Sequence, residues 1–266
     1  MHLINGKALA DKILCDIKNQ IEQNDIKSGL AIILVGNDPA SKIYVRLKQK
    51  TCENLGIDCH VYLFADDAKQ EKIVEAINFL NEDQAVKGIL VQLPLPTGFD
   101  ETKILNTIAP AKDVDALTSA PLVISPLAQS IAELIKSTSE RLTTKKFVVL
   151  ANHSAICASL KTLFPENQIE YISPTTVAWQ EKTKTADILI ACVGKINTIT
   201  ADKIKQGAII IDVGINKAPD GATTGDVDAQ SVENIASWLT PVPGGVGPMT
   251  IAMLLKNLLA LSNKNN

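Results

Sequence analysis

Glycine is absent from a long central stretch of the chain, because none occurs between Phe99 and Val193. Many nucleotide-binding domains use a glycine-rich turn to bring backbone N–H groups close to a pyrophosphate. A turn of that kind cannot be built in this stretch. Metal-site patterns are also missing, since the five cysteines have no CxxC spacing and the three histidines form no HxxH or HExxH pattern. We therefore expect no metal site, and thiols that are buried or idle.

An excess of basic charge and long apolar runs are missing as well. The net charge is -3 at pH 7, so the composition predicts no binding to nucleic acid or to an anionic membrane. No apolar run is long enough to span a bilayer and none forms an N-terminal signal segment, so we expect a cytoplasmic protein. With 266 residues, 46% of them hydrophobic, the chain has the composition of a folded protein of about two domains.

What is present is an alternation of strand-type and helix-type segments, which is typical of α/β domains with parallel sheets. In the first half, strands are predicted at 30–35, 58–64 and 87–92, and helices at 8–21, 39–55 and 69–81. In the second half, strands are predicted at 147–150, 168–172, 187–193 and 208–213, and helices at 127–135, 154–163 and 251–261. Ligands of such sheets lie beyond the carboxyl ends of the strands. The weakly periodic stretch 116–126 is the predicted domain boundary.

The helix after the first of these strands carries a candidate pair of proton-handling groups. Asp38 suits the N-cap position and Pro39 the first helical position. Tyr44 and Lys48 are four residues apart and so share one face of the helix. A phenol beside an amine near a strand end can move protons. Taken alone, however, the two residues favour a half-buried tyrosine and a solvated lysine.

Two later segments offer further polar candidates. Gln92 follows the third strand, where its amide could orient a lysine or contact a heterocycle, or could simply face water in a turn. Asp113 and Asp115 are two apart on an extended segment and face opposite ways. We expect one of them to point into a cleft and the other to pair with Lys112.

The segment 240–250 concentrates proline and glycine before the last predicted helix. Such a loop is rigid and poor in side chains, which suits backbone contact with a flat ligand or a phosphate. Bland loops rarely combine so many of these residues, so the pattern favours a binding role.

Together, six motifs resemble the methylenetetrahydrofolate dehydrogenase/cyclohydrolase family, and the resemblance runs nearly end to end. The motifs are Pro-Ala-Ser-x-x-Tyr-Val-x-x-Lys-x-Lys at 39–50, Gly-Ile-Leu-Val-Gln-Leu-Pro-Leu-Pro at 88–96, Lys-Asp-Val-Asp at 112–115, Gly-Ile-Asn at 214–216, Gly-Asp-Val-Asp at 225–228, and Thr-Pro-Val-Pro-Gly-Gly-Val-Gly-Pro-Met-Thr at 240–250.

The resemblance implies a two-domain α/β protein. A three-layer α/β folate domain, 1–118 completed by the carboxyl-terminal helix within 239–266, would face a Rossmann-like domain, 119–238. The family transfers a hydride from 5,10-methylenetetrahydrofolate to NADP and hydrolyses the methenyl product to 10-formyltetrahydrofolate, in one-carbon metabolism that supplies purine biosynthesis. The implied partners are a small folate substrate and a second copy of the chain. We expect that homodimer to form through the second sheet, because the apolar strand at 187–193 needs its edges covered.

The resemblance also implies roles for particular residues. Lys48 is the acid/base group of the hydrolysis, Tyr44 packs on the folate rings, Gln92 modulates Lys48, and Asp115 holds the pterin edge. The implied folate-binding residues are Tyr44, Lys48, Val91, Gln92, Leu93, Asp115, Pro243, Gly244, Gly245, Val246 and Gly247. The implied cofactor-binding residues are Ala151, Asn152, His153, Ser173, Gly194 and Ile215. A lysine can serve as the base only if burial or neighbours lower its pKa.

The departures from the family pattern cluster in the cofactor half. The family's Gly-Arg-Ser-x-x-Val-Gly-x-Pro is Ala-Asn-His-Ser-Ala-Ile-Cys-Ala-Ser at 151–159, and its Cys-His-Ser-Lys/Arg-Thr is Ile-Ser-Pro-Thr-Thr at 172–176. The basic groups that would meet an adenosine 2′-phosphate are therefore missing, with only His153 near. Ala116 also replaces a usual glycine, and Glu170 could favour NAD over NADP.

Three hypotheses follow from this contrast between the halves. The protein is a bifunctional enzyme with NADP or NAD bound weakly, a cyclohydrolase that has lost the redox step, or a folate-binding protein without turnover. The retained pair of Tyr44 and Lys48 favours an enzyme over a binder, because binding alone needs no lysine base.

Overall fold

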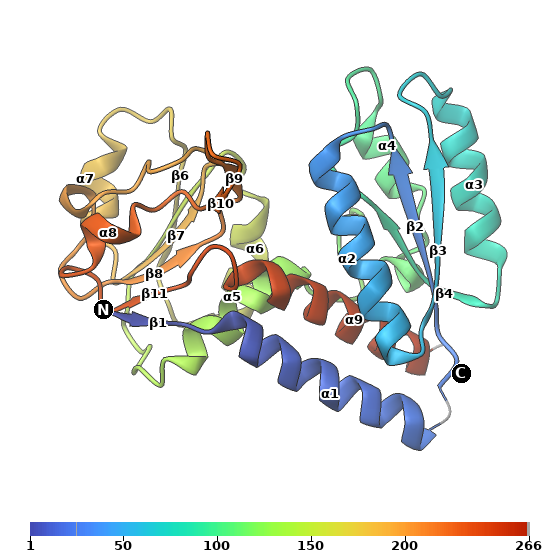
Figure 1. Ribbon diagram of the computed structural model, residues 1–266, viewed down its shortest axis with the longest axis horizontal. Coiled ribbons are helices and arrows are strands. Elements are labelled where there is room, and N and C mark those ends of the chain that lie inside the picture. The colour runs from blue at the N-terminus through green and yellow to red at the C-terminus, as the bar shows by residue number, and fades with distance from the viewer. Residues whose placement is uncertain (25, 265–266) are drawn as a thin grey trace. The chain divides into compact units, whose positions relative to one another are not determined.

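The computed structural model describes residues 1–24 and 26–264, and the chain folds into two compact units (Figure 1). Unit 1 consists of Met1–Asp11 and Leu127–Thr250, and unit 2 of Lys12–Pro126 and the segment from Ile251 onward. The expected boundaries differ from this division at 1–11 and 239–250, which lie in unit 1, and at 119–126, which lies in unit 2. The reason for the first two differences is the pairing of two short strands, β1 (His2–Leu3) with β11 (Trp238–Leu239) and β11 with β8 (Ile209–Asp212), in the larger sheet.

Unit 2 is built on a parallel three-stranded sheet with the order β3-β2-β4. Its strands are β2 (Gly29–Val35), β3 (Asp58–Phe64) and β4 (Val86–Val91), and its helices are α2 (Pro39–Leu55), α3 (Gln70–Glu82), α4 (Glu101–Asn106), most of α1 (Gly6–Asn24) and most of α9 (Val246–Lys264). Alternate residues of β2 face opposite sides. Leu30, Ile32 and Leu34 pack with apolar residues of α1, α2 and α9, and Ala31, Ile33 and Val35 with those of α3 and α4. The predicted three-layer arrangement is confirmed.

Close packing of α9 on this sheet depends on Gly88 in β4. A Cβ at Gly88 would lie 2.5 Å from a methyl of Val114 and 2.7 Å from one of Leu258. Asn257 of α9 adds a hydrogen bond from Nδ2 to the carbonyl of Val114, at 2.9 Å. The carboxyl-terminal helix therefore completes the core of unit 2.

Unit 1 is built on a six-stranded parallel sheet with the order β1-β11-β8-β7-β5-β6. The remaining strands are β5 (Phe147–Ala151), β6 (Ile169–Ile172) and β7 (Ile188–Cys192), and the helices include α5 (Pro126–Ser137), α6 (Ala155–Leu163), α7 (Trp179–Thr183) and α8 (Ala229–Val232). From β5 the chain runs first to β6 on one side and then to β7 on the other, which is the topological switch of a doubly wound sheet. The predicted Rossmann-like architecture is confirmed.

Several local predictions for unit 1 are corrected by the structure. The strand predicted at 187–193 is β7, and both of its edges are covered because it pairs with β5 and β8. It therefore cannot supply a free edge for a second copy of the chain. Helix α9 begins at Val246, so Gly247 and Pro248 lie in its first turn and not in a loop. The elements β1, α7, β11 and the β9–β10 hairpin (Asn216–Lys217, Thr223–Thr224) were not predicted, since each is very short.

The described residues also bear on the metal and membrane expectations. All five cysteines are free thiols. No three His, Cys, Asp or Glu side chains within 1–24 and 26–264 are grouped so as to hold a metal ion. None of the helices in those ranges is long and apolar enough to cross a membrane.

Candidate functional site

Lys48 lies on the buried face of α2. The helix begins as predicted, with the Asp38 carboxylate accepting a hydrogen bond from the Ser41 N–H at 2.7 Å, and ends at Gly56 in the left-handed region. Lys48 is only 9% exposed, although lysine is almost never buried without a partner. Tyr44, one turn earlier, is half-buried, and burial raises the pKa of its phenol.

Gln92 meets the lysine from the end of β4. Lys48 Nζ donates to Gln92 Oε1 at 2.7 Å, and Gln92 Nε2 donates to the Leu93 carbonyl at 2.7 Å. The second hydrogen bond fixes which way the amide faces, since only the oxygen can accept from the lysine. The structure thus joins Gln92 to Lys48, and excludes the alternative of a turn glutamine that faces only water.

Asp115 provides a negative charge close to the same amine. Burial lowers the pKa of Lys48, and the charge of Asp115 opposes part of that change. Burial in turn raises the pKa of Asp115, which the charge of Lys48 partly offsets. A lysine whose pKa is lowered holds more free amine near neutral pH, which is the form that accepts a proton.

The expected pairing of Lys112 with an aspartate is wrong. Lys112 Nζ donates to the carbonyls of Leu80 and Asp83, at 2.8 and 2.7 Å. Asp113 is buried and accepts from the N–H groups of Leu117 and Thr118, at 3.2 and 2.8 Å. The sequence does not predict these partners, because it does not show which main-chain carbonyls of another element will lie near the lysine. Asp113 therefore holds the turn that follows Asp115.

Two thiols lie beside Lys48, a position that the expectation of buried or idle cysteines did not include. The thiols of Cys52 on α2 and Cys59 on β3 hydrogen-bond to each other, which raises the pKa of Cys52 and lowers that of Cys59. Both also act on the pKa of Lys48. The spacing of four residues from Lys48 to Cys52 was an available signal. The approach of Cys59 depends on how β3 packs against α2.

In unit 1, the residues implied for the cofactor come together along one edge of the sheet. Ala151 ends β5, Ser173 follows β6, Gly194 follows β7 and Ile215 follows β8. These four strands are parallel neighbours, so their carboxyl ends line a single edge. Asn152 and His153, just after β5, are exposed at the same edge. This is where doubly wound sheets bind nucleotides.

Asn152 spans the switch point of that edge. Its Nδ2 donates to the Val193 carbonyl beyond β7 at 2.9 Å, and its own carbonyl accepts from the Tyr171 hydroxyl at 3.3 Å. The side chain thus ties the end of β5 to the end of β7, where a pyrophosphate lies in this fold. Ser154, at the N-cap of α6, makes no side-chain cap hydrogen bond.

Glu170 and Ser173 are engaged within unit 1. The carboxylate of Glu170 pairs with Lys146 at 2.7 Å and with Lys182 at 3.4 Å. The hydroxyl of Ser173 lies 2.7 Å from that of Thr175, in a local turn. The proposed preference of Glu170 for an NAD ribose would therefore compete with two ion pairs.

Two glycines of the segment 243–247 are required by the local structure of unit 1, Gly244 by its backbone conformation and Gly245 by close packing. The Gly244 carbonyl accepts from the Lys7 N–H at 2.8 Å, and Gly244 has a φ of 103°. A Cβ at Gly245 would lie 2.6 Å from the Pro241 carbonyl oxygen, and a Cβ at Gly6 would lie 2.0 Å from the carbonyl oxygen of Gly245. Glycine is needed here whatever the loop binds.

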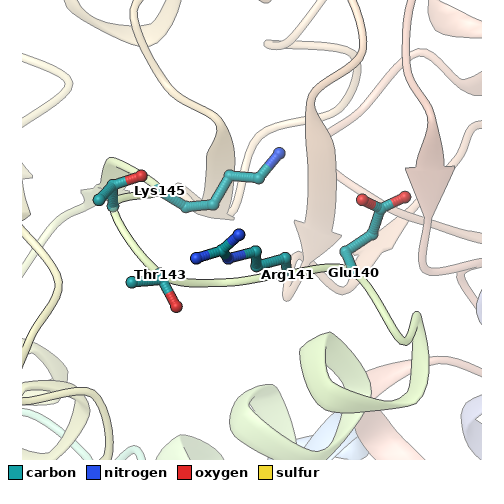
Figure 2. Close-up of a pocket in the computed structure, with 5 residues that line it drawn as sticks. Glu140, Arg141, Thr143 and Lys145 are labelled. Atoms are coloured by element: carbon teal, nitrogen blue, oxygen red, sulfur yellow. The ribbon is translucent and has the colours of Figure 1, made fainter.

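A surface hollow of about 450 Å³ lies elsewhere in unit 1 (Figure 2). It is lined by Glu140, Arg141, Thr143, Thr144 and Lys145, in the segment before β5. This is the amino-terminal edge of the parallel sheet, opposite the edge that carries Ala151 and Gly194. The hollow is therefore separate from the cofactor-type edge of unit 1.

The structure defines an α/β protein of two units, one with a nucleotide-type sheet edge and one with a buried lysine oriented by an amide. The family model for the tetrahydrofolate dehydrogenase/cyclohydrolase catalytic domain matches residues 4–115, and that for the NAD(P)-binding domain of the same family matches residues 125–266. The chain belongs to the tetrahydrofolate dehydrogenase/cyclohydrolase family.

Curated relatives and solved structures agree with this assignment. The bifunctional protein FolD of Acetivibrio thermocellus is 41% identical over 269 residues, which cover 96% of this chain and 94% of that protein. The crystal structure of the FolD enzyme of Campylobacter jejuni has a TM-score of 0.93 at 35% identity and covers 100% of both chains. That of Trypanosoma brucei, complexed with NADP cofactor and inhibitor, has a TM-score of 0.92 at 29% identity and covers 98% of this chain and 97% of that chain.

Proposed function

We propose that this protein oxidises 5,10-methylenetetrahydrofolate to 5,10-methenyltetrahydrofolate with NADP, and hydrolyses the product to 10-formyltetrahydrofolate. The family and its curated FolD members support both activities. The observation that carries the hydrolytic half is the buried amine of Lys48, oriented by Gln92 at 2.7 Å.

Lys48 is the proposed base and acid of the hydrolysis. The methenyl carbon is already an electrophile, so a positioned base and a water suffice. The free amine of Lys48 takes a proton from the water as its oxygen bonds to the methenyl carbon. The hydroxyl of this adduct loses its remaining proton to solvent as its C–O bond becomes the carbonyl. The bond from that carbon to N5 breaks at the same time, and the lysine returns its proton to N5, which leaves the formyl group on N10.

The other folate contacts are proposed around this amine. Tyr44 stacks on the ring system, and Asp115 accepts hydrogen bonds from the adjacent amino and ring N–H groups of the pterin. Further contacts are proposed for Val91 and Leu93 at the end of β4 and for the segment 243–247.

NADP is the proposed redox cofactor, and its role is to accept the hydride. Ala151, Asn152, His153, Ser173, Gly194 and Ile215 would hold it at the carboxyl edge of the sheet of unit 1. Open space around the Cα of Gly194, which has a φ of 73°, fits close approach of a ligand. The bridge from Asn152 to Val193 and the lack of an arginine or lysine at 151–153 fit a pyrophosphate and a 2′-phosphate poorly.

A cyclohydrolase without the redox step is the second candidate function, and the Asn152 bridge at the switch point favours it. The buried amine of Lys48, oriented by Gln92 at 2.7 Å, argues against the third hypothesis, a folate binder without turnover, because binding alone needs no lysine base.

We also propose a homodimer in the cytosol. Five free thiols suit a reducing compartment. The strand β6 ends the described sheet on one side and carries Tyr171, a partly exposed aromatic residue, which supports pairing through that edge. Light scattering at micromolar concentration tests the dimer, and a monomer there would refute it.

The decisive experiment follows both half-reactions spectrophotometrically on one preparation. Methenyltetrahydrofolate should be hydrolysed without nucleotide, and methylenetetrahydrofolate should be oxidised only when NADP is added. Hydrolysis without oxidation would establish the cyclohydrolase alone. Folate binding with neither reaction would leave only the binding protein.

A further inference from the structure

Two buried carboxylates lie beneath the nucleotide-type edge of unit 1. Asp226 is 0% exposed and Asp212 is 3% exposed. They belong to the turn before α8 and to the end of β8, beside the motifs at 214–216 and 225–228. The roles proposed above for the folate and the cofactor use neither of them.

Each oxygen of Asp226 accepts two hydrogen bonds. Oδ2 accepts from the N–H groups of Val193 at 2.6 Å and Gly194 at 3.0 Å, and Oδ1 accepts from the N–H of Lys195 and from Asn216 Nδ2, both at 2.9 Å. Three of these donors are consecutive backbone groups of the turn after β7, and the fourth belongs to the segment after β8. One carboxylate thus joins the two turns that carry Gly194 and Ile215.

Asp212 fixes the backbone that presents Asp226. It accepts from the N–H groups of Asp226 at 3.0 Å, Val227 at 2.9 Å and Gly214 at 2.9 Å. The close approach of these carboxylates requires two of the motif glycines. A Cβ at Gly225 would lie 1.8 Å from Asp212 Oδ2, and a Cβ at Gly214 would lie 2.2 Å from Asp226 Oδ1.

We propose that Asp226 is a positioning residue of the dehydrogenase half-reaction, which holds the turns of Gly194 and Ile215 in the conformation that receives the nicotinamide nucleotide. The inference rests on the proposed cofactor site. Preorganised turns bind a ligand without the entropic cost of becoming ordered at that moment. Asp226 does not itself face the ligand edge, because its four acceptor positions are filled from within unit 1.

The arrangement demands a carboxylate and not an amide. An asparagine of the same shape has one acceptor oxygen, and its NH₂ group would face two of the four donors. Two charge-assisted hydrogen bonds would be replaced by donor–donor contacts, while the volume of the side chain would stay the same. The substitution Asp226→Asn therefore tests the hydrogen bonds without opening a cavity.

The experiment compares Asp226→Asn with a control and a milder variant. Asp220→Asn, in the exposed β9–β10 turn, removes a carboxylate that accepts from the Ala222 N–H and is the matched control. Asn216→Ala removes one donor to Asp226 and leaves the three backbone groups in place. Amide hydrogen exchange of the peptide over 193–195, calorimetric titration with NADP and with NAD, and hydrolysis of methenyltetrahydrofolate without nucleotide are measured on all four proteins.

For Asp226→Asn we expect amide exchange over 193–195 to be faster by roughly tenfold or more, and nucleotide affinity to be weaker by roughly tenfold or more. The rate of methenyltetrahydrofolate hydrolysis should stay within about twofold of wild type. Asn216→Ala should also give faster exchange and weaker affinity, but with smaller changes than Asp226→Asn. Asp220→Asn should change none of the three measurements. A merely structural role would lower hydrolysis and affinity together.

Exchange and affinity in Asp226→Asn equal to wild type would overturn the role of Asp226. If that variant does not fold, Asn216→Ala decides, and no change in its exchange and affinity would overturn the inference. Wild-type protein that binds neither nucleotide would instead refute the proposed dehydrogenase function, and with it the ligand that Asp226 is said to serve.

Discussion

Each unit buries an ionisable side chain, and the two side chains differ in how fully they are hydrogen-bonded. In unit 2, Lys48 is buried against a neutral amide, and burial lowers its pKa. In unit 1, Asp226 is buried among four N–H donors that fill both of its oxygens. A buried polar group costs free energy unless it is hydrogen-bonded. The amine of Lys48 can therefore gain or lose a proton during a reaction. The carboxylate of Asp226 has all of its acceptor positions filled by hydrogen bonds, three of them from backbone N–H groups.

The units also differ in where the chain departs from its family pattern. The residues around Lys48 keep that pattern, apart from Ala116 in place of glycine. The sheet edge of unit 1 has Ala151, Asn152 and His153 in place of the family's Gly-Arg-Ser. The contrast suggests that the hydrolytic half is intact and the redox half is weakened, and the following measurements test it.

The largest effect is expected from Lys48→Met. Removal of the base should reduce the hydrolysis of methenyltetrahydrofolate by about a thousandfold or more, because general bases contribute roughly 10²–10⁴ to a rate. Folate affinity should stay within roughly tenfold, since one side chain is lost from a large contact. Lys50→Met, on the exposed face of α2, is the matched control and should retain full activity. Full turnover in Lys48→Met would refute the assignment of this lysine.

The next effect concerns the affinity for NADP. Two lost charge-assisted hydrogen bonds, each worth about 1.5–3 kcal/mol, predict binding at least about a hundredfold weaker than in a relative that keeps them. We expect the dehydrogenase rate to fall far below the cyclohydrolase rate. Calorimetric titration with NADP and NAD, with and without folate, measures this. Micromolar affinity for NADP would refute the hypothesis that the cofactor site of unit 1 is weakened.

Gln92→Glu should shift the pH dependence of hydrolysis. In the wild type, the rate should rise with pH through the lowered pKa of Lys48 and then level off, because the free amine is the base. A carboxylate in place of the amide, 2.7 Å from Nζ in the wild type, favours the charged lysine and raises its pKa. The midpoint should move upward by roughly one to three pH units, with a lower rate at pH 7.

The pH–rate profile of Gln92→Glu is compared with that of Gln49→Glu, which adds the same charge next to Lys48 in the chain but on a different face of α2. An unshifted midpoint in Gln92→Glu would show that the amine of Lys48 does not limit the rate.

The smallest effect is expected from Ala116→Gly. Ala116 has a φ of 56°, in the left-handed region that costs a residue with a Cβ about 1–2 kcal/mol. Glycine removes this strain but gains freedom in the unfolded chain, so the free energy of unfolding should rise by about 0.5–1 kcal/mol. Ala76→Gly within α3 should lower it by about 1 kcal/mol. Urea unfolding of both variants checks the opposite signs.

The sequence predicted elements with strong local signals more accurately than features that depend on distant segments. The strand at 58–64 and the helix from Pro39 to Gly56 agree with the structure, because alternation, caps and a C-terminal glycine are local signals. The partner of Lys112 does not, because it depends on packing against a distant segment. The start of α9 at Val246 also differs from the predicted start at 251. Short strands such as β1 and β11 are too short to show a hydrophobic periodicity in the sequence. They are defined by their pairing with neighbouring strands of the sheet.

The sequence by itself determined the two-unit α/β class, the family and the identity of the candidate site residues, since these rest on periodicity and on motifs that can be compared residue by residue. Only the tertiary structure decided the chemical state of those residues. The lowered pKa of Lys48, the thiol pair of Cys52 and Cys59 beside it, the bridge from Asn152 and the saturated carboxylate of Asp226 all arise between segments distant in the chain. Burial and hydrogen bonding are set by which elements pack together, and the order of residues along one segment does not contain that information.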